Sequence, residues 1–289
     1  MPSFQEHHVP FDAHHLYARE FQGAGPAIVL LHGFPDDLHL YDYLVPCLGE
    51  RHVIAFDFLG WGLSDKPAGY RHMAAGQTAE IDAVVNYFRL NDVVLVAHDA
   101  SGPPAIDWSL DHPDRVAQLV LLNTYYSWMP TLRPPEAIAL YSTPVIRAAA
   151  RWIVRRWDWV DKRLYMWQVG RFMRDEHTRK QMLAQLYPSF RKSREAFWSL
   201  NNDLLGTLFN RLLQHKRLRL FNRPVRIIFG NDDPYLNPGV ARRFHKLLPT
   251  SDLFLLPTAR HYVQVDEPQK VADVITSAVG VRTAGPARE

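Results

Sequence analysis

The run VVLVAHDASGPPA, residues 93–105, constrains the fold of this chain more than any other segment. A β-branched apolar stretch ends in small residues, and a helix-compatible segment follows. Such a run predicts a sharp strand–turn–helix corner, which needs small neighbours such as Ala97, Ser101 and Gly102. The apex of the corner is Asp99. A carboxylate there can displace a leaving group at an sp³ carbon and form an alkyl-enzyme ester.

Strands alternate with helices and turns on both sides of this corner. Short apolar runs predict eight strands: His8–Pro10, His15–Arg19, Ala27–Leu31, Val53–Phe56, Val93–Ala97, Val116–Leu122, Val225–Phe229 and Leu253–Leu256. Thr78–Phe88 is a predicted amphipathic helix. The alternation predicts an α/β fold with a mostly parallel central sheet that helices cover on both faces.

The middle of the chain has a different character, because it holds most of the tryptophans, many arginines and no strand signal. We predict an α/β core from residues 1–123 and 220–289, with a helical cap, residues 124–219, inserted between them. Arg147, Arg151 and Arg155 recur at helical spacing beside apolar residues. A membrane-surface helix would show such a face, but we favour a cap helix with a solvated arginine side. The tail Arg282–Glu289 is expected to be frayed.

Length and charge limit the partners. A chain of 289 residues suits one large α/β domain with an insertion, and a formal charge of +3 is too small to argue for nucleic acid. Cys47 is alone, which favours a reducing compartment. The N-terminal residues do not read as a secretory signal, and no run approaches the roughly 20 apolar residues of a membrane span. We expect a cytoplasmic protein with no nucleic-acid or membrane partner, and leave open whether it is a homodimer.

Two further loops carry residues that would complete the chemistry of Asp99. Asp232 and Asp233 follow the strand that ends at Phe229, so they emerge at the carboxyl end of the sheet, where ligands bind in open α/β folds. His261 follows the last predicted strand. The order nucleophile, acid, histidine is the one this kind of corner uses. We prefer Asp233 as the acid for its Gly-x-x-Asp spacing and keep Asp232 as the competitor.

On these motifs the chain resembles the α/β-hydrolases with an aspartate nucleophile, the group of epoxide hydrolases and haloalkane dehalogenases. The matching segments are His32-Gly33-Phe34-Pro35, Asp57-Phe58-Leu59-Gly60-Trp61-Gly62-Leu63-Ser64, His98-Asp99-Ala100-Ser101-Gly102 and the Asp233 and His261 loops. The resemblance implies that Asp99 attacks carbon and that His261, oriented by Asp233, activates water to hydrolyse the ester. It also implies an oxyanion hole from the backbone N–H groups of Phe34 and Ala100. Since the base must be neutral, activity should fall below about pH 6.

The chain departs from these relatives at its halide donors. Haloalkane dehalogenases place a tryptophan after the nucleophile, and this chain has Ala100. Many of them use an asparagine or a cap tryptophan as a second donor, and at the position of that asparagine this chain has Phe34. A halide leaving without donors would be uncompensated in a dry pocket, which disfavours a standard dehalogenase. The arginine that follows the nucleophile in fluoroacetate dehalogenases is absent as well.

Epoxide hydrolases need cap tyrosines that protonate the ring oxygen. The candidates are Tyr125, Tyr126, Tyr141, Tyr165 and Tyr187. We prefer Tyr141 and Tyr187, although the family's usual second position, near 198–201, holds no tyrosine. Ser101 is a remote alternative nucleophile, since we expect it to face away from the site. His32 and His98 are expected to shape turns.

The favoured hypothesis is therefore an epoxide hydrolase that acts on a small apolar substrate and needs no metal or organic cofactor. The alternatives are a dehalogenase-like hydrolase with non-standard halide donors and a non-catalytic ligand-binding protein on the same fold. Abundant aromatic residues in the cap favour an apolar substrate in a closed pocket.

Overall fold

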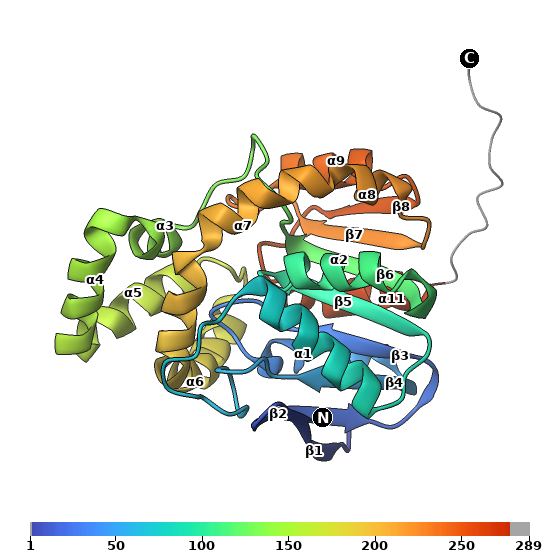
Figure 1. Cartoon of the computed structure of the whole chain (residues 1–289), viewed down its shortest axis with the longest axis horizontal. Helices are drawn as coiled ribbons and strands as arrows, with labels where there is room; N and C mark the ends of the chain where they lie inside the picture. The colour runs from blue at the N-terminus through green and yellow to red at the C-terminus, as the bar shows by residue number, and fades with distance from the viewer. Residues whose placement is uncertain (1, 278–289) are drawn as a thin grey trace.

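An eight-stranded sheet forms the centre of the molecule (Figure 1). The computed structural model describes residues 2–277, so the predicted frayed tail, Arg282–Glu289, lies outside the described residues. The strands are β1 (Gln5–Phe11), β2 (His14–Phe21), β3 (Ala24–Leu31), β4 (Arg51–Phe56), β5 (Val93–Asp99), β6 (Val116–Thr124), β7 (Val225–Gly230) and β8 (Ser251–Leu256). Each contains one of the eight predicted strands, so the predicted strand set is confirmed.

The strands are ordered β1-β2-β4-β3-β5-β6-β7-β8. β1 pairs antiparallel with β2, and β2 antiparallel with β4, while all the other pairs are parallel. This confirms the predicted α/β class with a mostly parallel sheet. The carboxyl ends of β5, β7 and β8 therefore meet at one edge, and this edge receives the loops of the candidate site.

Helices cover both faces of the sheet, which explains the unbroken apolar runs of its central strands. Along β5, Val93, Leu95 and Ala97 face one apolar cluster, and Val94 and Val96 face the other. The core helices are α1 (Ala74–Tyr87), α2 (Gly102–Asp111), α9 (Pro238–Leu247), α10 (Val263–Asp266) and α11 (Pro268–Thr276). Short 3₁₀ turns lie at Leu38–Tyr41, Val45–Leu48, Pro113–Arg115 and Arg211–Gln214.

The first long helix begins earlier than the sequence indicated. We predicted Thr78–Phe88, but α1 begins at Ala74. Met73 precedes it and makes no side-chain capping bond, so the usual N-terminal signal is absent from the sequence. Burial of Ala74 and Gln77 against the core extends the helix by a turn.

Between β6 and β7 the described chain is helical, and four of these helices lie beside the sheet, at the left of Figure 1. The helices of this segment are α3 (Glu136–Ser142), α4 (Pro144–Arg156), α5 (Asp158–Gly170), α6 (Glu176–Asn202), α7 (Leu204–Asn210) and α8 (His215–Leu220). They occupy the segment that we predicted as the cap. Among the described residues, no helix is long and apolar enough to cross a bilayer.

The arginine side of α4 is solvated only in part, because Arg155 is exposed while Arg147 and Arg151 are half-buried. The Arg151 guanidinium lies 5.5 Å from the centre of the Trp198 ring on α6, and that of Arg155 lies 4.8 Å from it. Arg155 also forms an ion pair with Glu195 at 2.8 Å. The aromatic and acidic groups on α6 thus hold Arg151 and Arg155 along the edge of the contact, while Ala150 and Val154 are the buried residues of α4.

Candidate active site

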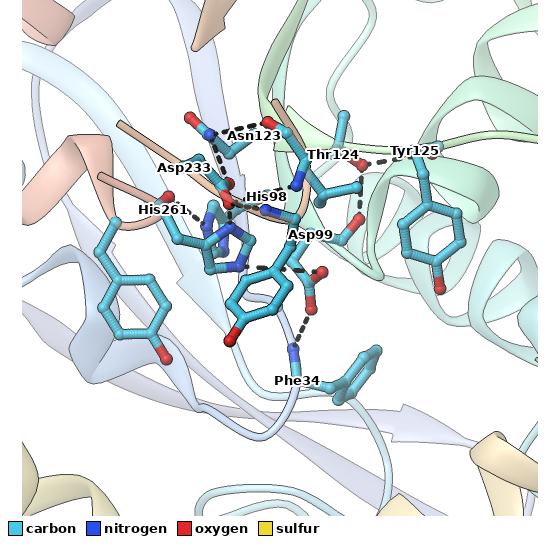
Figure 2. Close-up of polar contacts among 12 residues, drawn as sticks. Phe34, His98, Asp99, Asn123, Thr124, Tyr125, Asp233 and His261 are labelled. Atoms are coloured by element: carbon cyan, nitrogen blue, oxygen red, sulfur yellow. Dashed lines mark hydrogen bonds and ion pairs between the residues drawn. The ribbon is translucent and has the colours of Figure 1, made fainter. Parts of the chain in front are cut away.

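Asp99, the predicted nucleophile, ends β5 in a strained turn (Figure 2). Its φ of 50° lies in the left-handed region, which costs a residue other than glycine about 1–3 kcal/mol. The Thr124 hydroxyl donates to the Asp99 carbonyl and holds the corner. A Cβ at Gly102 would overlap that hydroxyl, and one at Gly33 would lie 2.7 Å from the Asp99 Cβ. Small residues are therefore required around Asp99, as its sequence context predicted.

His261 lies on the loop after β8, between Asp99 and Asp233 (Figure 2). Its Nδ1 is 2.7 Å from Asp233 Oδ2, and its Nε2 is 3.9 Å from Asp99 Oδ1. The imidazole is 4% exposed and packs on the Phe172 ring, with centroids 4.7 Å apart. When Nδ1–H donates to Asp233, the neutral ring presents an unprotonated Nε2 toward Asp99. Three loops far apart in sequence thus bring a base and two carboxylates together.

The structure brings Asp233 rather than Asp232 to the histidine. Asp233 is 2% exposed, and its Oδ1 accepts the backbone N–H of Tyr235 at 2.8 Å. Asp232 is exposed on the same turn. Only the buried carboxylate can orient His261 through a hydrogen bond shielded from water.

Asn123 supports this acid, and the sequence reasoning missed it. Its Nδ2 donates to Asp233 Oδ2 at 2.7 Å, and its Oδ1 accepts the Gly230 backbone N–H at 2.8 Å. The residue is completely buried near the end of β6, with a φ of 28°. An asparagine directly after the apolar run Val116–Leu122 was the available signal, because a buried amide needs polar partners.

Burial and charge act against each other on His261. Burial alone would lower the pKa of the imidazole, but Asp233, then Asp99 and Asp36, outweigh it, so the pKa lies above its ordinary value. Burial raises the pKa of Asp99, although His261 and backbone N–H groups oppose the rise. Asp233 is the reverse case, because its hydrogen bonds and His261 overcome burial and lower its pKa.

Two backbone N–H groups contact the Asp99 carboxylate, as expected for the predicted oxyanion hole. The Phe34 N–H donates to Asp99 Oδ2 at 3.2 Å, and the Ala100 N–H also stabilises the ionised carboxyl and opposes the rise in its pKa. Ser101 is completely buried, and its hydroxyl donates to the Leu31 carbonyl at 3.0 Å. The serine hydroxyl is thus committed to the turn, as expected for a residue that faces away from the site.

The two other histidines near the site hold backbone in place. In His32, Nδ1 is 2.8 Å from the Gly33 carbonyl, and Nε2 accepts the Phe58 N–H at 3.1 Å. His98 places Nε2 3.2 Å from the His261 carbonyl. Burial lowers the pKa of His32 to about 4 and that of His98 well below its ordinary value. Both rings are neutral at pH 7, which fits the expected role in shaping turns.

A cavity of about 470 Å³ opens above Asp99. Asp99, His261 and Phe34 line it from the core, and apolar residues of the cap, such as Leu164 and Phe197, line it from the other side. Because most of this wall is hydrocarbon, with a few polar side chains such as Gln168 and Asn201, the cavity suits a mainly apolar molecule of small to medium size.

Two cap tyrosines line this cavity with hydroxyls that have no hydrogen-bond acceptor. Tyr141 on α3 and Tyr165 on α5 are both buried, and neither hydroxyl has an acceptor for its proton, although the Trp198 N–H stabilises the oxygen of Tyr141. Burial raises both pKa values well above that of an ordinary tyrosine. Both phenols therefore carry their protons at any physiological pH, and each leaves a buried donor free for a ligand.

The structure does not bring Tyr187, the predicted second tyrosine, to the cavity. Tyr187 on α6 does not line the cavity, and its ring packs on Tyr165 at 5.3 Å, beneath the Lys162 ammonium at 5.9 Å. Leu186, the residue before it, is buried, and Tyr187 therefore lies on the neighbouring side of α6, which faces α5. Tyr165, another of the five candidates, occupies the wall instead. Tyr126 donates to Asp107 at 2.7 Å and is engaged elsewhere.

No group of three histidine, cysteine, aspartate or glutamate side chains within the described part of the chain could hold a metal ion. The donor set at the site itself is two carboxylates and one imidazole, and that imidazole already bonds to Asp233. The arrangement supplies a nucleophile, a base and hydrogen-bond donors.

A strained corner between strand and helix, with a histidine and an acid on later loops of a parallel sheet, defines the class of α/β-hydrolases. Residues 26–268 match the alpha/beta hydrolase fold family, and the chain belongs to that family. Accordingly, it is a hydrolase of the α/β type.

Several known proteins resemble the chain at low identity. Haloalkane dehalogenase 2 of Mycobacterium tuberculosis is 27% identical over 266 residues, covering 90% of both sequences. A fluoroacetate dehalogenase of a Burkholderia species is 37% identical over 110 residues, 35% of each sequence. The structure of 2-hydroxy-6-oxo-6-phenylhexa-2,4-dienoate hydrolase from Rhodococcus sp. strain RHA1 superposes with a TM-score of 0.78 at 17% identity, covering 95% of this chain and 98% of that one. This last likeness concerns the fold alone.

Proposed function

We propose that the protein is an epoxide hydrolase that acts through an ester on Asp99. The observation that carries the proposal is the pair of hydroxyls without an acceptor, Tyr141 and Tyr165, in the same cavity as the Asp99 carboxylate. Opening an epoxide places negative charge on the ring oxygen, and phenol donors held in a dry cavity stabilise that charge. The apolar wall favours a hydrocarbon epoxide.

In the first step Asp99 Oδ1 attacks a ring carbon. A bond forms between that oxygen and the carbon, and the bond from the carbon to the ring oxygen breaks. The ring oxygen takes a proton from Tyr141 or Tyr165, so the product is a hydroxyalkyl ester of Asp99 and one tyrosinate. Oδ2, which accepts the Phe34 N–H at 3.2 Å, becomes the ester carbonyl oxygen.

In the second step His261 Nε2 takes a proton from water, and the resulting hydroxide adds to the ester carbonyl carbon. The negative charge moves to Oδ2, where the Phe34 and Ala100 N–H groups stabilise it, and one such donor is typically worth roughly 3–4 kcal/mol. The bond between the carbonyl carbon and Oδ1 then breaks, and the proton of the added hydroxyl passes to Oδ1. A diol therefore leaves with Oδ1, and Asp99 is again a carboxylate. The proton on His261 passes to the tyrosinate, which restores both groups.

The test is the intact mass of His261→Gln after incubation with epoxides and alkyl halides. Removal of the base should strand the ester, and a gain equal to the whole epoxide is expected. A tryptic peptide should place the adduct on Asp99, and Asp99→Asn should gain nothing. Absence of any adduct across the panel would count against the enzyme and favour a ligand-binding protein.

The two phenols are tested by Tyr141→Phe, Tyr165→Phe and the double variant. Loss of both donors should slow ester formation from an epoxide by at least about 10²-fold. Tyr187→Phe is the matched control, because Tyr187 lies outside the cavity, and it should react at the parental rate.

A haloalkane dehalogenase is the second candidate, favoured by the 27% identity to Haloalkane dehalogenase 2. Against it, Ala100 and Phe34 offer no side-chain donor for a halide, and the cavity-lining tyrosines would have to serve instead. The same mass experiment decides between the two. A gain equal to an alkyl group, with halide released, would establish this second function.

A further inference from the structure

Helix α4 packs against the rest of the cap through a narrow strip of its surface. Arg151 and Arg155 flank Trp198 on α6, and Ala150 and Val154 are the buried residues between them. In Figure 1 this helix forms the outer edge of the cap, on the side away from the sheet. Its remaining side therefore faces away from the protein.

This remaining side is apolar, and we call it the outer face of α4. It consists of Val145, Ile146, Ala148, Ala149, Trp152 and Ile153. Val145 is 87% exposed and Trp152 62%, and the Trp157 ring extends the face by packing edge-on against Trp152 at 5.5 Å. Trp159, 64% exposed, is two residues further along the chain, at the start of α5. A continuous exposed face of this kind marks a surface that is covered in use.

Exposed cations lie on α4 and on the next helix, α5. Arg156, Lys162 and Arg163 are exposed on α4 and α5, and within the described residues none of them forms an ion pair with a carboxylate. The predicted cap segment as a whole is also positively charged. Residues 124–219 contain 18 lysines and arginines against 7 acidic residues, a formal charge of +11, whereas the rest of the chain carries −8.

We propose that the outer face of α4 docks on an anionic lipid bilayer. Tryptophan and β-branched residues on one side of a short helix insert at the boundary between headgroups and acyl chains, and flanking cations bind anionic headgroups. A second copy of this chain is the poorer occupant, because it would bring a second cap of charge +11 against the first. This proposal departs from our expectation of no membrane partner, which rested on the lack of a membrane span and on reading α4 as a cap helix with a solvated arginine side.

The docked face adjoins the cavity. Ser142, Thr143 and Pro144 line the cavity, and Pro144 is also the first residue of α4. Docking would therefore place this part of the cavity wall next to the bilayer. If the substrate is apolar, as in the proposed function, it could enter from the lipid; the docking itself does not depend on that function.

The test is co-sedimentation of the full chain with vesicles in the absence of substrate. We expect binding to phosphatidylcholine vesicles that contain roughly 30% phosphatidylglycerol, and much weaker binding to phosphatidylcholine alone. The double variant Trp152→Ser/Ile153→Ser should bind at least about tenfold more weakly. Leu63→Ser/Tyr87→Ser is the matched control, because Leu63 (60% exposed) and Tyr87 (44%) lie on the core, and it should bind like the parent.

The charge is tested separately. Arg156→Gln should weaken binding to the anionic vesicles by about fivefold. Arg242 is exposed on the core helix α9, so Arg242→Gln should leave this binding unchanged. Thermal unfolding of each variant checks its fold. Equal binding to neutral and anionic vesicles, no binding to either, or a concentration-dependent dimer that Trp152→Ser/Ile153→Ser abolishes would each overturn the proposal. None of these readouts depends on epoxide hydrolysis.

Discussion

Replacement of Asn123 by alanine should destabilise the protein far more than its size suggests. The amide makes three buried hydrogen bonds: to Asp233 Oδ2 at 2.7 Å, to the Leu236 carbonyl at 3.4 Å and from the Gly230 N–H at 2.8 Å. Loss of the bond to the carboxylate costs about 1.5–3 kcal/mol, and an orphaned buried N–H costs about 1–3 kcal/mol. We expect the free energy of unfolding to fall by about 3–5 kcal/mol, measured by urea denaturation at pH 7.

Asn86 supplies a matched control. Its Nδ2 also donates to an aspartate, Asp82, at 2.8 Å, and its Oδ1 also accepts a hydrogen bond, from Arg115 at 2.8 Å. The same two kinds of bond are thus lost in Asn86→Ala, but at an exposed site where water replaces them. That variant should change the free energy of unfolding by about 0.5 kcal/mol or less. If Asn123→Ala costs less than about 1 kcal/mol with an unchanged m-value, the reasoning from burial is refuted.

Three further predictions concern the site and its support. The acid limb of kcat/KM should have its midpoint above pH 6.5, because the carboxylates raise the pKa of His261; a midpoint near pH 6, as expected from the sequence, would contradict this. Gly33→Ala should lower kcat/KM by at least about 10²-fold, since its Cβ would lie 2.7 Å from the Asp99 Cβ, whereas Gly206→Ala meets nothing within 4 Å and should be silent. Burial raises the pKa of Glu80 from 4.5 to about 8. The native state therefore holds that proton more tightly, and stability is lost as pH rises from 4.5 through 8. Glu80→Gln should reduce this loss, seen by comparing urea midpoints at pH 5 and pH 8.

The strands and the site loops could be predicted because they depend on local sequence. Central strands of a parallel sheet are buried on both faces, so each reads as a continuous apolar run. The carboxyl ends of such strands meet at one edge, so the sequence alone predicts that Asp99, Asp233 and His261 lie close together. The choice between Asp232 and Asp233 was harder, because adjacent residues of one turn differ only in direction. Burial of Asp233 beneath Asn123 decides it.

The cap was less predictable because its side chains are oriented by tertiary contacts. Tyr165 and Tyr187 both lie on helices, and no local signal says which ring reaches the cavity. Packing of α5 against α6 turns Tyr165 inward, where its ring stacks on Phe190 at 4.7 Å, and leaves Tyr187 outside. Likewise, arginines that recur on one side of α4 predict a solvated side, and no local signal indicates that Arg151 and Arg155 contact the Trp198 ring.

The positive charges of the cap lie on two surfaces, one against the core and one toward the outside, and salt should screen these two sets of charges to different degrees. Toward the core, Arg211 pairs with Asp107 at 2.6 Å, and these side chains are only 12% and 25% exposed. Toward the outside, Arg156 is exposed and makes no such pair within the described residues. Exposed charges are screened within about 10 Å at 0.1 M salt, while partly buried pairs are screened much less. Raising the ionic strength should therefore release the protein from anionic vesicles well before it weakens hydrolysis of a soluble substrate. If activity and vesicle binding are lost together, the cap is held on the core by exposed charge, and the two surfaces are not independent.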